Sequence, residues 1–358
     1  MDKNIEQVRE RIDRIDGQIL KLLNQRVQET VTIGALKKEK GKAIYDPARE
    51  RRILEKLKGE SRGPLAEEAV NAIFQEIFSV SRSLEYPLRI AYFGPEATFT
   101  HQAALKTFGT QAEYFSQKSI PSVFSFIEKR QADYGIVPVE NSTEGIVNHT
   151  LDMFLDSDLK IVNEVMLPIR NHLLGFGSWK KVNEVYSHPQ PLAQCQNWLE
   201  ENLTDVTLHE TESTAEAAKL VKKKKGRTAA IASEIAATLY GVPILIRDIQ
   251  DNIRNYTRFL VIGTHFAERS GRDRTSVLFS IKDRVGALHD MLVPFRKEGL
   301  NLTKIESRPT KRRAWEYVFF VDFLGYKDEP AVQKALSELK DLCLFLKILG
   351  SYPIADEA

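Results

Sequence analysis

The first part of the chain repeats apolar residues with the period of a helix. They recur at spacings of three and four, which is typical of an amphipathic helix with one apolar face. They are Ile5, Val8, Ile12, Ile15, Ile19 and Leu22, and the pattern continues through Ile33 and Leu36. Gly41 is expected to end this helix. Asp46 and Pro47 suit the N-cap and first position of a second helix that runs to about Leu57.

A third helix is predicted after Pro64, and it ends near Tyr86 because Pro87 discourages helical backbone in the residue before it. Three helices give only a small core. A first helix of this length has little to pack against within its own chain. We therefore expect this region to form a homodimer or a higher oligomer.

The pattern changes from Leu88 onwards, where short apolar runs alternate with helical stretches. This order predicts an α/β domain. The runs are RIAYF, YGIVPV, LLGF, AAIA, ILIRDI and RFLVIG.

A third unit follows the polar stretch ERSGRDR. Its pattern predicts a strand, a helix, two strands, a helix and a final strand, which is the βαββαβ order of a ferredoxin-like α+β domain. The first four elements are expected at residues 276–281, 287–297, 302–306 and 317–323.

Composition and charge point to small-molecule partners. Of the 358 residues, 42% are hydrophobic and 28% are charged, which fits a globular chain of two or three domains. The formal net charge of +2 gives no global attraction to nucleic acid or membrane, and we expect neither as a partner. The run Lys222 to Lys225 lacks interleaved aromatic residues, so a solvated helix end is expected there.

The amino-terminal residues are charged, and no segment has the length and apolarity of a signal peptide or membrane span. The cytoplasm is therefore the expected location. Cys195 and Cys343 cannot form a zinc site by themselves and are expected to be packed thiols. No motif implies a metal or an organic cofactor.

Two cations occupy positions of the first helix where core residues are expected. Arg26 takes the next apolar-face position after Leu22, and Lys37 follows on nearly the same face, about 16 Å along the axis at about 1.5 Å per residue. A small dicarboxylate between them would satisfy both charges. The alternative is a salt bridge with an acidic side chain of the same region, namely Glu29, Asp46 or Glu50.

Residues 1 to about 86 resemble the all-helical class of chorismate mutase. The resemblance implies that two long helices interlock in a dimer, that Arg26 and the partner's Arg9 bind the carboxylates of chorismate, and that Lys37 approaches its ether oxygen. It also implies that Glu50 takes the substrate hydroxyl. The matching positions are Arg9, Arg26, Lys37, Asp46, Arg49, Glu50, Ser81 and Glu85.

Glu85 departs from many members of that class, which have glutamine as a second donor to the ether oxygen. A carboxyl group donates only when it is protonated, so the sequence predicts a raised pKa for Glu85 and mutase activity that favours lower pH. The alternative is that Glu85 faces solvent at the end of its helix.

Four polar clusters adjoin the predicted strands of the α/β region. Ligand sites in open α/β sheets lie at such strand ends. The clusters are AYFGPEATFTHQAA, DYGIVPVENSTEGIVNHTLD, YSHPQPLAQC and DNIRNYTRFLVIG.

Taken together, these four clusters resemble those of prephenate dehydratase, over roughly residues 88 to 265. The resemblance implies a two-lobed fold like that of periplasmic solute-binding domains, with prephenate in the cleft and Thr257 as the key hydroxyl. The expected supporting residues are Glu140, Asn141, Ser187, Gln194, Glu212 and Arg258, with Thr98 to Thr100 near the substrate.

Some single residues of this region have alternative roles. His101, His172 and His188 could act as acids, although a lone histidine beside a strand more often serves structure. Thr257 could merely cap a turn before its strand.

Two motifs of the last unit, GALHD and ESRP, resemble the ACT domain of prephenate dehydratases. The resemblance implies that these motifs border a phenylalanine site at a dimer interface. The alternative is an ordinary helix start and strand end. The residues concerned are Gly286, Ala287, Leu288, His289, Glu306, Ser307, Arg308 and Pro309.

Together the resemblances imply a multidomain α, α/β and α+β enzyme of phenylalanine biosynthesis. It would convert chorismate to prephenate and prephenate to phenylpyruvate, and phenylalanine would inhibit it. The expected domains are residues 1–87, 88–266 and 273–358. The main alternatives are a small-molecule sensor, with a solute-binding cleft and an ACT domain but no catalysis, and a dehydratase whose mutase is lost through Glu85.

Overall fold

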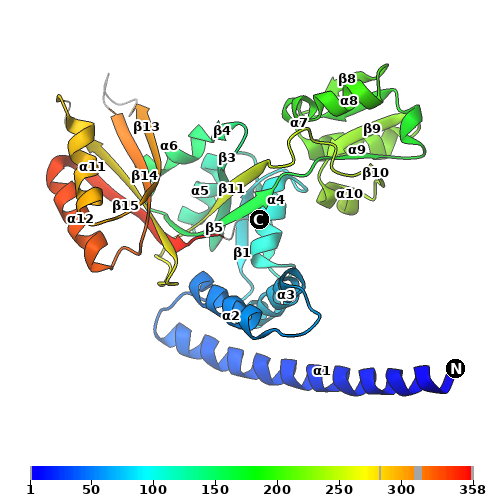
Figure 1. Ribbon diagram of the computed structural model, residues 1–358, viewed down its shortest axis with the longest axis horizontal. Coiled ribbons are helices and arrows are strands. Elements are labelled where there is room, and N and C mark those ends of the chain that lie inside the picture. The colour runs from blue at the N-terminus through cyan, green and yellow to red at the C-terminus, as the bar shows by residue number, and fades with distance from the viewer. Residues whose placement is uncertain (1, 282–283, 310–316, 356–358) are drawn as a thin grey trace.

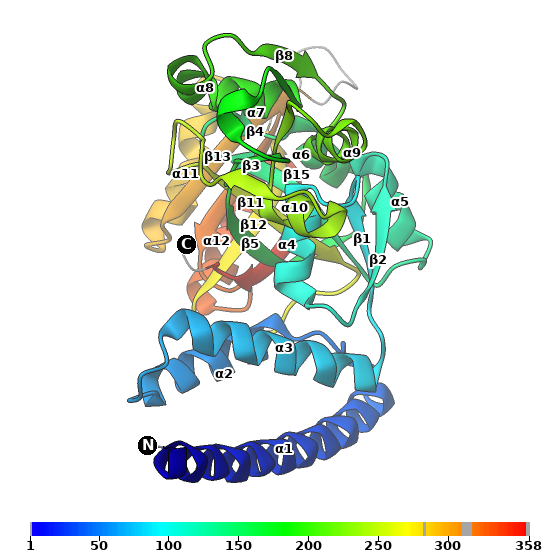
Figure 2. The ribbon, with the colours of Figure 1, turned by 90° about the vertical axis from the view of Figure 1, so that its right-hand side faces the viewer.

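Helix α1 (Asp2–Glu39) stands out from the rest of the molecule in the computed structural model, which describes residues 2–281, 284–309 and 317–355 (Figure 1). Helices α2 (Pro47–Glu60) and α3 (Glu67–Glu85) lie between α1 and the sheet-containing part of the chain (Figure 2). The expected cap at Asp46 is confirmed, because its carboxylate accepts a hydrogen bond of 2.9 Å from the Arg49 amide.

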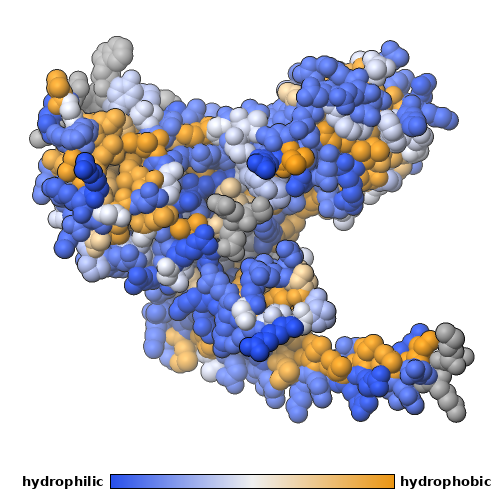
Figure 3. All heavy atoms as spheres, viewed as in Figure 1, coloured by the Kyte–Doolittle hydropathy of each residue, from blue (hydrophilic) through white to orange (hydrophobic). Residues whose placement is uncertain are grey.

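The apolar face of α1 is uncovered in the single chain. The hydropathy surface shows it as a stripe along the helix (Figure 3). Seven of its members are about half exposed or more: Ile5, Ile12, Ile15, Ile19, Leu22, Ile33 and Leu36. An apolar face of this length needs a partner to remove it from water.

Two lobes follow the helical domain. The first lobe is a mixed sheet in the order β2-β1-β3-β11-β5, with β4 paired to β3 and helices α4–α6 packed on it. Strands β1, β2 and β3 are parallel, and β11 runs antiparallel to both β3 and β5. Its elements are β1 (Arg89–Phe93), α4 (Phe99–Phe108), β2 (Glu113–Gln117), α5 (Ile120–Glu128), β3 (Tyr134–Asn141), β4 (Gly145–Ile146), α6 (Asn148–Asp156), β5 (Lys160–Pro168) and β11 (Tyr256–Gly263).

The second lobe has its own sheet in the order β10-β6-β9-β7-β8. The chain enters this lobe after β5 and returns to the first lobe before β11, so two segments connect the lobes. Its elements are β6 (His172–Gly175), the 3-10 turn η1 (Trp179–Lys181), β7 (Glu184–Ser187), α7 (Pro189–Gln194), α8 (Gln196–Asn202), β8 (Thr207–Glu210), α9 (Thr214–Lys224), β9 (Thr228–Ala232), α10 (Glu234–Tyr240) and β10 (Ile244–Ile246).

The C-terminal domain confirms the βαββαβ order. Its four strands form an antiparallel sheet in the order β13-β14-β12-β15. The elements are β12 (Asp273–Ile281), α11 (Ala287–Lys297), β13 (Leu302–Pro309), β14 (Tyr317–Leu324), α12 (Pro330–Leu342) and β15 (Cys343–Pro353).

The first lobe holds the other units in place through one shared hydrophobic core. Phe320, Leu349 and Tyr352 of the C-terminal sheet belong to this core, and so does Tyr45 of the helical domain. Gly350 allows the close approach, because a Cβ there would lie 2.2 Å from the Ile161 carbonyl oxygen of β5.

All six apolar runs contain strands, but the runs do not include β2, β4, β5, β7 or β8. The longest of these is β5, whose KIVNEVMLP run mixes polar residues into a buried strand. Its Glu164 is 4% exposed because it is paired with arginine side chains. Among the described residues, no helix is long and apolar enough to cross a bilayer.

Candidate active sites

The two cations predicted to share a site in the helical domain face α3 and the α1–α2 loop. The Arg26 guanidinium donates to the Ser81 hydroxyl and lies 5.4 Å from the centre of the Phe78 ring. Lys37 Nζ donates to the Ile44 carbonyl oxygen over 2.8 Å. Arg26 is thus held by a neutral hydroxyl, which leaves its charge available to an anion.

Glu85 lies inside this cluster and not in solvent. Its Oε2 is buried and has no hydrogen-bond partner in the described part of the chain. Gly34 of α1 makes room for it, because a Cβ at Gly34 would lie 2.9 Å from Glu85 Cγ. Burial raises the pKa of Glu85, and Glu50 adds to the shift, while Lys37 and Arg82 oppose it. The raised pKa has the direction that the sequence predicted.

Glu50 is already engaged in the single chain. Its carboxylate pairs with Arg82, which sequence reasoning missed, and Arg82 also donates over 2.9 Å to the Phe108 carbonyl oxygen in the first lobe. Burial raises the pKa of Glu50, although the neighbouring Arg82 opposes this. The side chains of Arg9 and Arg49 are exposed. Arg9 lies far along α1 from Arg26, so one chain cannot bring the two together.

Thr257 lies beside Asn141 in the first lobe. The two residues are opposite each other on β11 and β3, and Asn141 Nδ2 donates to the Thr257 hydroxyl oxygen over 2.7 Å. The same amide group donates to Asn255 Oδ1 over 2.8 Å. Because the Thr257 oxygen accepts from Asn141, its own proton is free to be donated elsewhere. Asn255 was missed, although it lies two residues before Thr257, directly before β11 begins.

Gln194 connects this cluster to the second lobe. Its Nε2 donates to Glu144 Oε1 over 3.3 Å, and the Glu144 amide donates to Asn141 Oδ1 over 2.9 Å. Ser187 ends β7, and its hydroxyl donates to the Ile231 carbonyl oxygen over 2.7 Å. Glu212 is exposed at the start of α9.

Glu140 and Arg258 are not brought together with Thr257. Each lies next in sequence to a cluster residue, and successive side chains of a strand point to opposite faces. Arg258 is buried against the C-terminal domain, and the Glu140 carboxylate pairs with Lys304 over 2.9 Å. Arg258 therefore lies on the strand face opposite Thr257, and its place near the substrate stays a prediction.

The three histidines considered as acids all accept hydrogen bonds from backbone amides. His101 accepts from Ala97, His172 from Asp248 and His188 from Gln190. Burial lowers the pKa of His101 and of His172. The lowered pKa favours the neutral imidazole in both residues, and the amide hydrogen bonds fit the structural alternative. Thr98, of the adjacent loop, caps α4.

Both cysteines are free thiols. Cys195 is buried and Cys343 is half-buried. Burial raises the pKa of both thiols, that of Cys343 to about 11. The described residues contain no group of three or more His, Cys, Asp or Glu side chains that could hold a metal ion.

The C-terminal motifs lie at a helix start and along an edge strand. Gly286 has a positive φ of 79° and precedes α11, whose first residue Ala287 is buried, while Leu288 and His289 are exposed. Exposure alternates along β13. Glu306 and Arg308 are half-buried, whereas Ser307 and Pro309 are exposed. Arg308 pairs with Asp152 of α6 over 3.0 Å.

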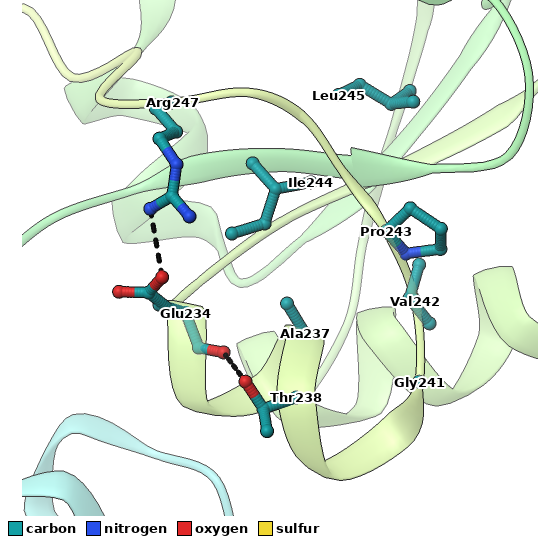
Figure 4. Close-up of a pocket in the computed structure, with 9 residues that line it drawn as sticks. All are labelled: Glu234, Ala237, Thr238, Gly241, Val242, Pro243, Ile244, Leu245 and Arg247. Atoms are coloured by element: carbon teal, nitrogen blue, oxygen red, sulfur yellow. Dashed lines mark hydrogen bonds and ion pairs between the residues drawn. The ribbon is translucent and has the colours of Figure 1, made fainter. Parts of the chain in front are cut away.

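One hollow of the second lobe is unrelated to these clusters (Figure 4). Two of its lining residues, Arg247 and Glu234, form an ion pair of 2.9 Å. None of its lining residues is a predicted site residue. They are Glu234, Ala237, Thr238, Gly241, Val242, Pro243, Ile244, Leu245 and Arg247.

Comparison with known proteins agrees with all three units. The family models for chorismate mutase type II, prephenate dehydratase and the ACT domain match residues 8–86, 90–267 and 275–341. The bifunctional chorismate mutase/prephenate dehydratase of Aquifex aeolicus is 50% identical over 99% of both chains. The prephenate dehydratase of Bacillus subtilis is 35% identical and covers 74% of this chain and 98% of its own.

A solved structure extends the agreement to the fold. It is the prephenate dehydratase of Arthrobacter aurescens in complex with L-Phe, which has a TM-score of 0.70 and 31% identity and covers 76% of this chain and 92% of its own.

The three units define a multidomain enzyme of aromatic amino acid synthesis. They are a helical domain with converging cations, a two-lobed domain with a buried threonine, and a ferredoxin-like ACT domain. The chain belongs to the bifunctional chorismate mutase/prephenate dehydratase family. It is an isomerase acting on chorismate and a carbon-oxygen lyase acting on prephenate, so neither the sensor nor the loss of the mutase is favoured.

Proposed function

We propose that chorismate binds in the helical domain among Arg26, Lys37 and Glu85. The rearrangement of chorismate is pericyclic and needs no covalent intermediate, so catalysis is positioning together with stabilisation of charge that develops on the ether oxygen. Lys37 supplies a positive charge to that oxygen, and Arg26 binds a carboxylate. The observation that carries this proposal is the convergence of these side chains between α1 and α3.

The proposal completes this site with a second chain. The exposed apolar face of α1 supports a homodimer in which Arg9 of one chain reaches the site of the other. Asp46, Arg49, Glu50 and Ser81 line the site. In this proposal Glu50 takes the substrate hydroxyl while it remains paired with Arg82.

Prephenate is proposed to bind between the two lobes, with Thr257 donating its proton as a hydrogen bond to the leaving hydroxyl. The hydroxyl leaves as water once it has taken up a proton, and the carboxylate leaves as carbon dioxide. The electron pair of the broken carbon–carbon bond completes the aromatic ring, so the enzyme mainly has to position a proton donor. Asn141 orients Thr257, and Gln194, Ser187 and Glu212 of the second lobe contribute to the other wall. The hydrogen bonds from Asn141 to Thr257 and from Gln194 to Glu144 support this arrangement.

Phenylalanine is proposed to bind the ACT domain between the residues of GALHD and ESRP and to lower dehydratase activity. The L-Phe complex of the Arthrobacter aurescens relative supports this role. Apolar side chains near both motifs are also exposed to solvent in the single chain: Val285 is fully exposed, Leu288 is 44% exposed and Ile305 is 45% exposed. We retain the boundaries 1–87, 88–266 and 273–358 as part of the proposal, together with a cytoplasmic location.

The test is a progress curve that starts from chorismate. Purified protein should convert chorismate through prephenate to phenylpyruvate, and phenylalanine should slow only the second step. Unchanged rate and unchanged oligomeric state at saturating phenylalanine would contradict the regulatory role, while prephenate accumulation without phenylalanine would contradict the dehydratase site.

Glu85 is expected to make the mutase pH-dependent. A raised pKa keeps the carboxyl group protonated to higher pH, so the donor to the ether oxygen is present below that pKa and is lost as the pH rises through it. Mutase kcat/KM should therefore fall on the alkaline side of this pKa. Glu85→Gln, which donates at every pH, should flatten the profile. An equally flat profile for both proteins would contradict the role of Glu85, with dehydratase activity of the same samples as the control.

A further inference from the structure

Strands β3 and β11 carry a charged pair, Glu140 and Arg258, on the face opposite to the candidate catalytic residues Asn141 and Thr257. Thr257 is opposite Asn141, and the next positions place Arg258 opposite Glu140. Because strand side chains alternate between faces, Thr257 and Asn141 meet on one face, and Arg258 and Glu140 lie on the other. Arg258 Nη1 is 3.9 Å from Glu140 Oε2.

The ACT domain holds both members of the charged pair. Lys304 of β13 donates to Glu140 Oε2 over 2.9 Å, and the Lys304 side chain is only 11% exposed. Arg258 donates over 2.7 Å to Asp322 of β14 and over 2.9 Å to the Tyr352 hydroxyl of β15. Three strands of the ACT sheet therefore contact residues that directly adjoin Asn141 and Thr257.

Arg258 is buried, and two of its three contacts join opposite charges while the third is to the neutral Tyr352 hydroxyl. Its third donor, Nε, reaches Glu164 of β5 over 2.7 Å. Burial acts to raise the pKa of Asp322, but Arg258 and the Ser276 hydroxyl hold that pKa below its usual range. Charge-assisted hydrogen bonds of this kind have strict geometry, and breaking one leaves a buried charge unpaired. The network therefore favours one arrangement of the ACT sheet against β3 and β11.

We propose that Glu140 and Arg258 are positioning residues through which the ACT domain sets the geometry of Asn141 and Thr257. The inference rests on the proposed role of Thr257. Lys304 lies two positions before Glu306 on β13, so a ligand that shifts this strand also shifts the cation that holds Glu140. A small displacement of a positioned donor is enough to slow a reaction greatly.

The test compares two lysines that both tie the ACT domain to the first lobe. Lys304 holds Glu140, whereas Lys347 of β15 donates over 2.6 Å to the Ser157 carbonyl oxygen, away from the catalytic strands. Lys304→Met should lower kcat for prephenate on the order of tenfold, leave KM nearly unchanged and weaken inhibition by phenylalanine. Lys347→Met should change none of these values. Lys304→Arg, which keeps the positive charge, should retain most of the original kcat. Mutase activity of the same chain reports that each variant is folded.

Equal losses in Lys304→Met and Lys347→Met would overturn the inference, because the contact would then only dock the domain. Unchanged kcat and unchanged phenylalanine response in Lys304→Met would also overturn it. Full activity of Thr257→Val would refute the proposed function first and this inference with it. A loss in Thr257→Val without any loss in Lys304→Met would leave the proposed function standing alone.

Discussion

Thr257→Val is expected to lower kcat for prephenate dehydration by about 100-fold or more while chorismate is still rearranged at the original rate. Valine preserves the shape of the side chain, which is 8% exposed, but removes the hydrogen-bond donor and leaves the Asn141 side-chain amide with Asn255 as its remaining acceptor. The measurement is phenylpyruvate formation from prephenate, with chorismate loss measured on the same sample.

Thr107→Val is the matched control for this substitution. Thr107 is also buried in the first lobe, but its hydroxyl only donates to the Ala103 carbonyl oxygen of its own helix, over 2.8 Å. This variant should keep both activities within about twofold, because an intrahelical hydroxyl bond contributes little. Similar losses in both variants would mean that Thr257 acts through stability and not through the reaction.

Lys37→Ala is expected to lower mutase activity by about 100-fold to 1000-fold and to leave dehydration of prephenate unchanged. The substitution removes the charge proposed to stabilise the ether oxygen in the transition state. Removal of such a donor should lower kcat, whereas loss of a carboxylate contact at Arg26 should act mainly on KM. The measurement is the disappearance of chorismate at saturating and at low concentration.

Lys38→Ala provides the control, since Lys38 is the next residue of α1 and its side chain is exposed. Its removal should alter neither activity. The assignment of Lys37 would be abandoned if Lys37→Ala kept more than about a third of the mutase kcat while Lys38→Ala behaved in the same way.

Much of this molecule follows from local signals in the sequence. The spacing of the apolar residues from Ile5 to Leu36 predicted α1, and Asp46-Pro47 predicted the start of α2. Both signals are local, because helix period and capping depend on neighbouring residues. The raised pKa of Glu85 was predicted from the chorismate mutase resemblance, because many members have a donor at this position. The alternation of strands and helices gave the α/β and βαββαβ classes for the same local reason.

The location of single site residues could be predicted only in part. The family resemblance grouped Asn141, Glu140 and Arg258 with Thr257, and of these three the structure brings Asn141 into contact with the Thr257 hydroxyl. The strand alternation that separates them was readable, yet which face bounds the cleft and which meets the ACT domain was not.

The sequence by itself thus determined the class of each domain, the main helices and strands and the chemistry of its candidate residues, because these depend on periodicity, caps and short motifs. Tertiary structure alone decided that Arg82 pairs with Glu50, that Lys304 pairs with Glu140, and that Arg258 belongs to the ACT contact. Those pairs join residues far apart in the chain. Their formation depends on which faces the hydrophobic core buries against each other, and no local pattern encodes that choice.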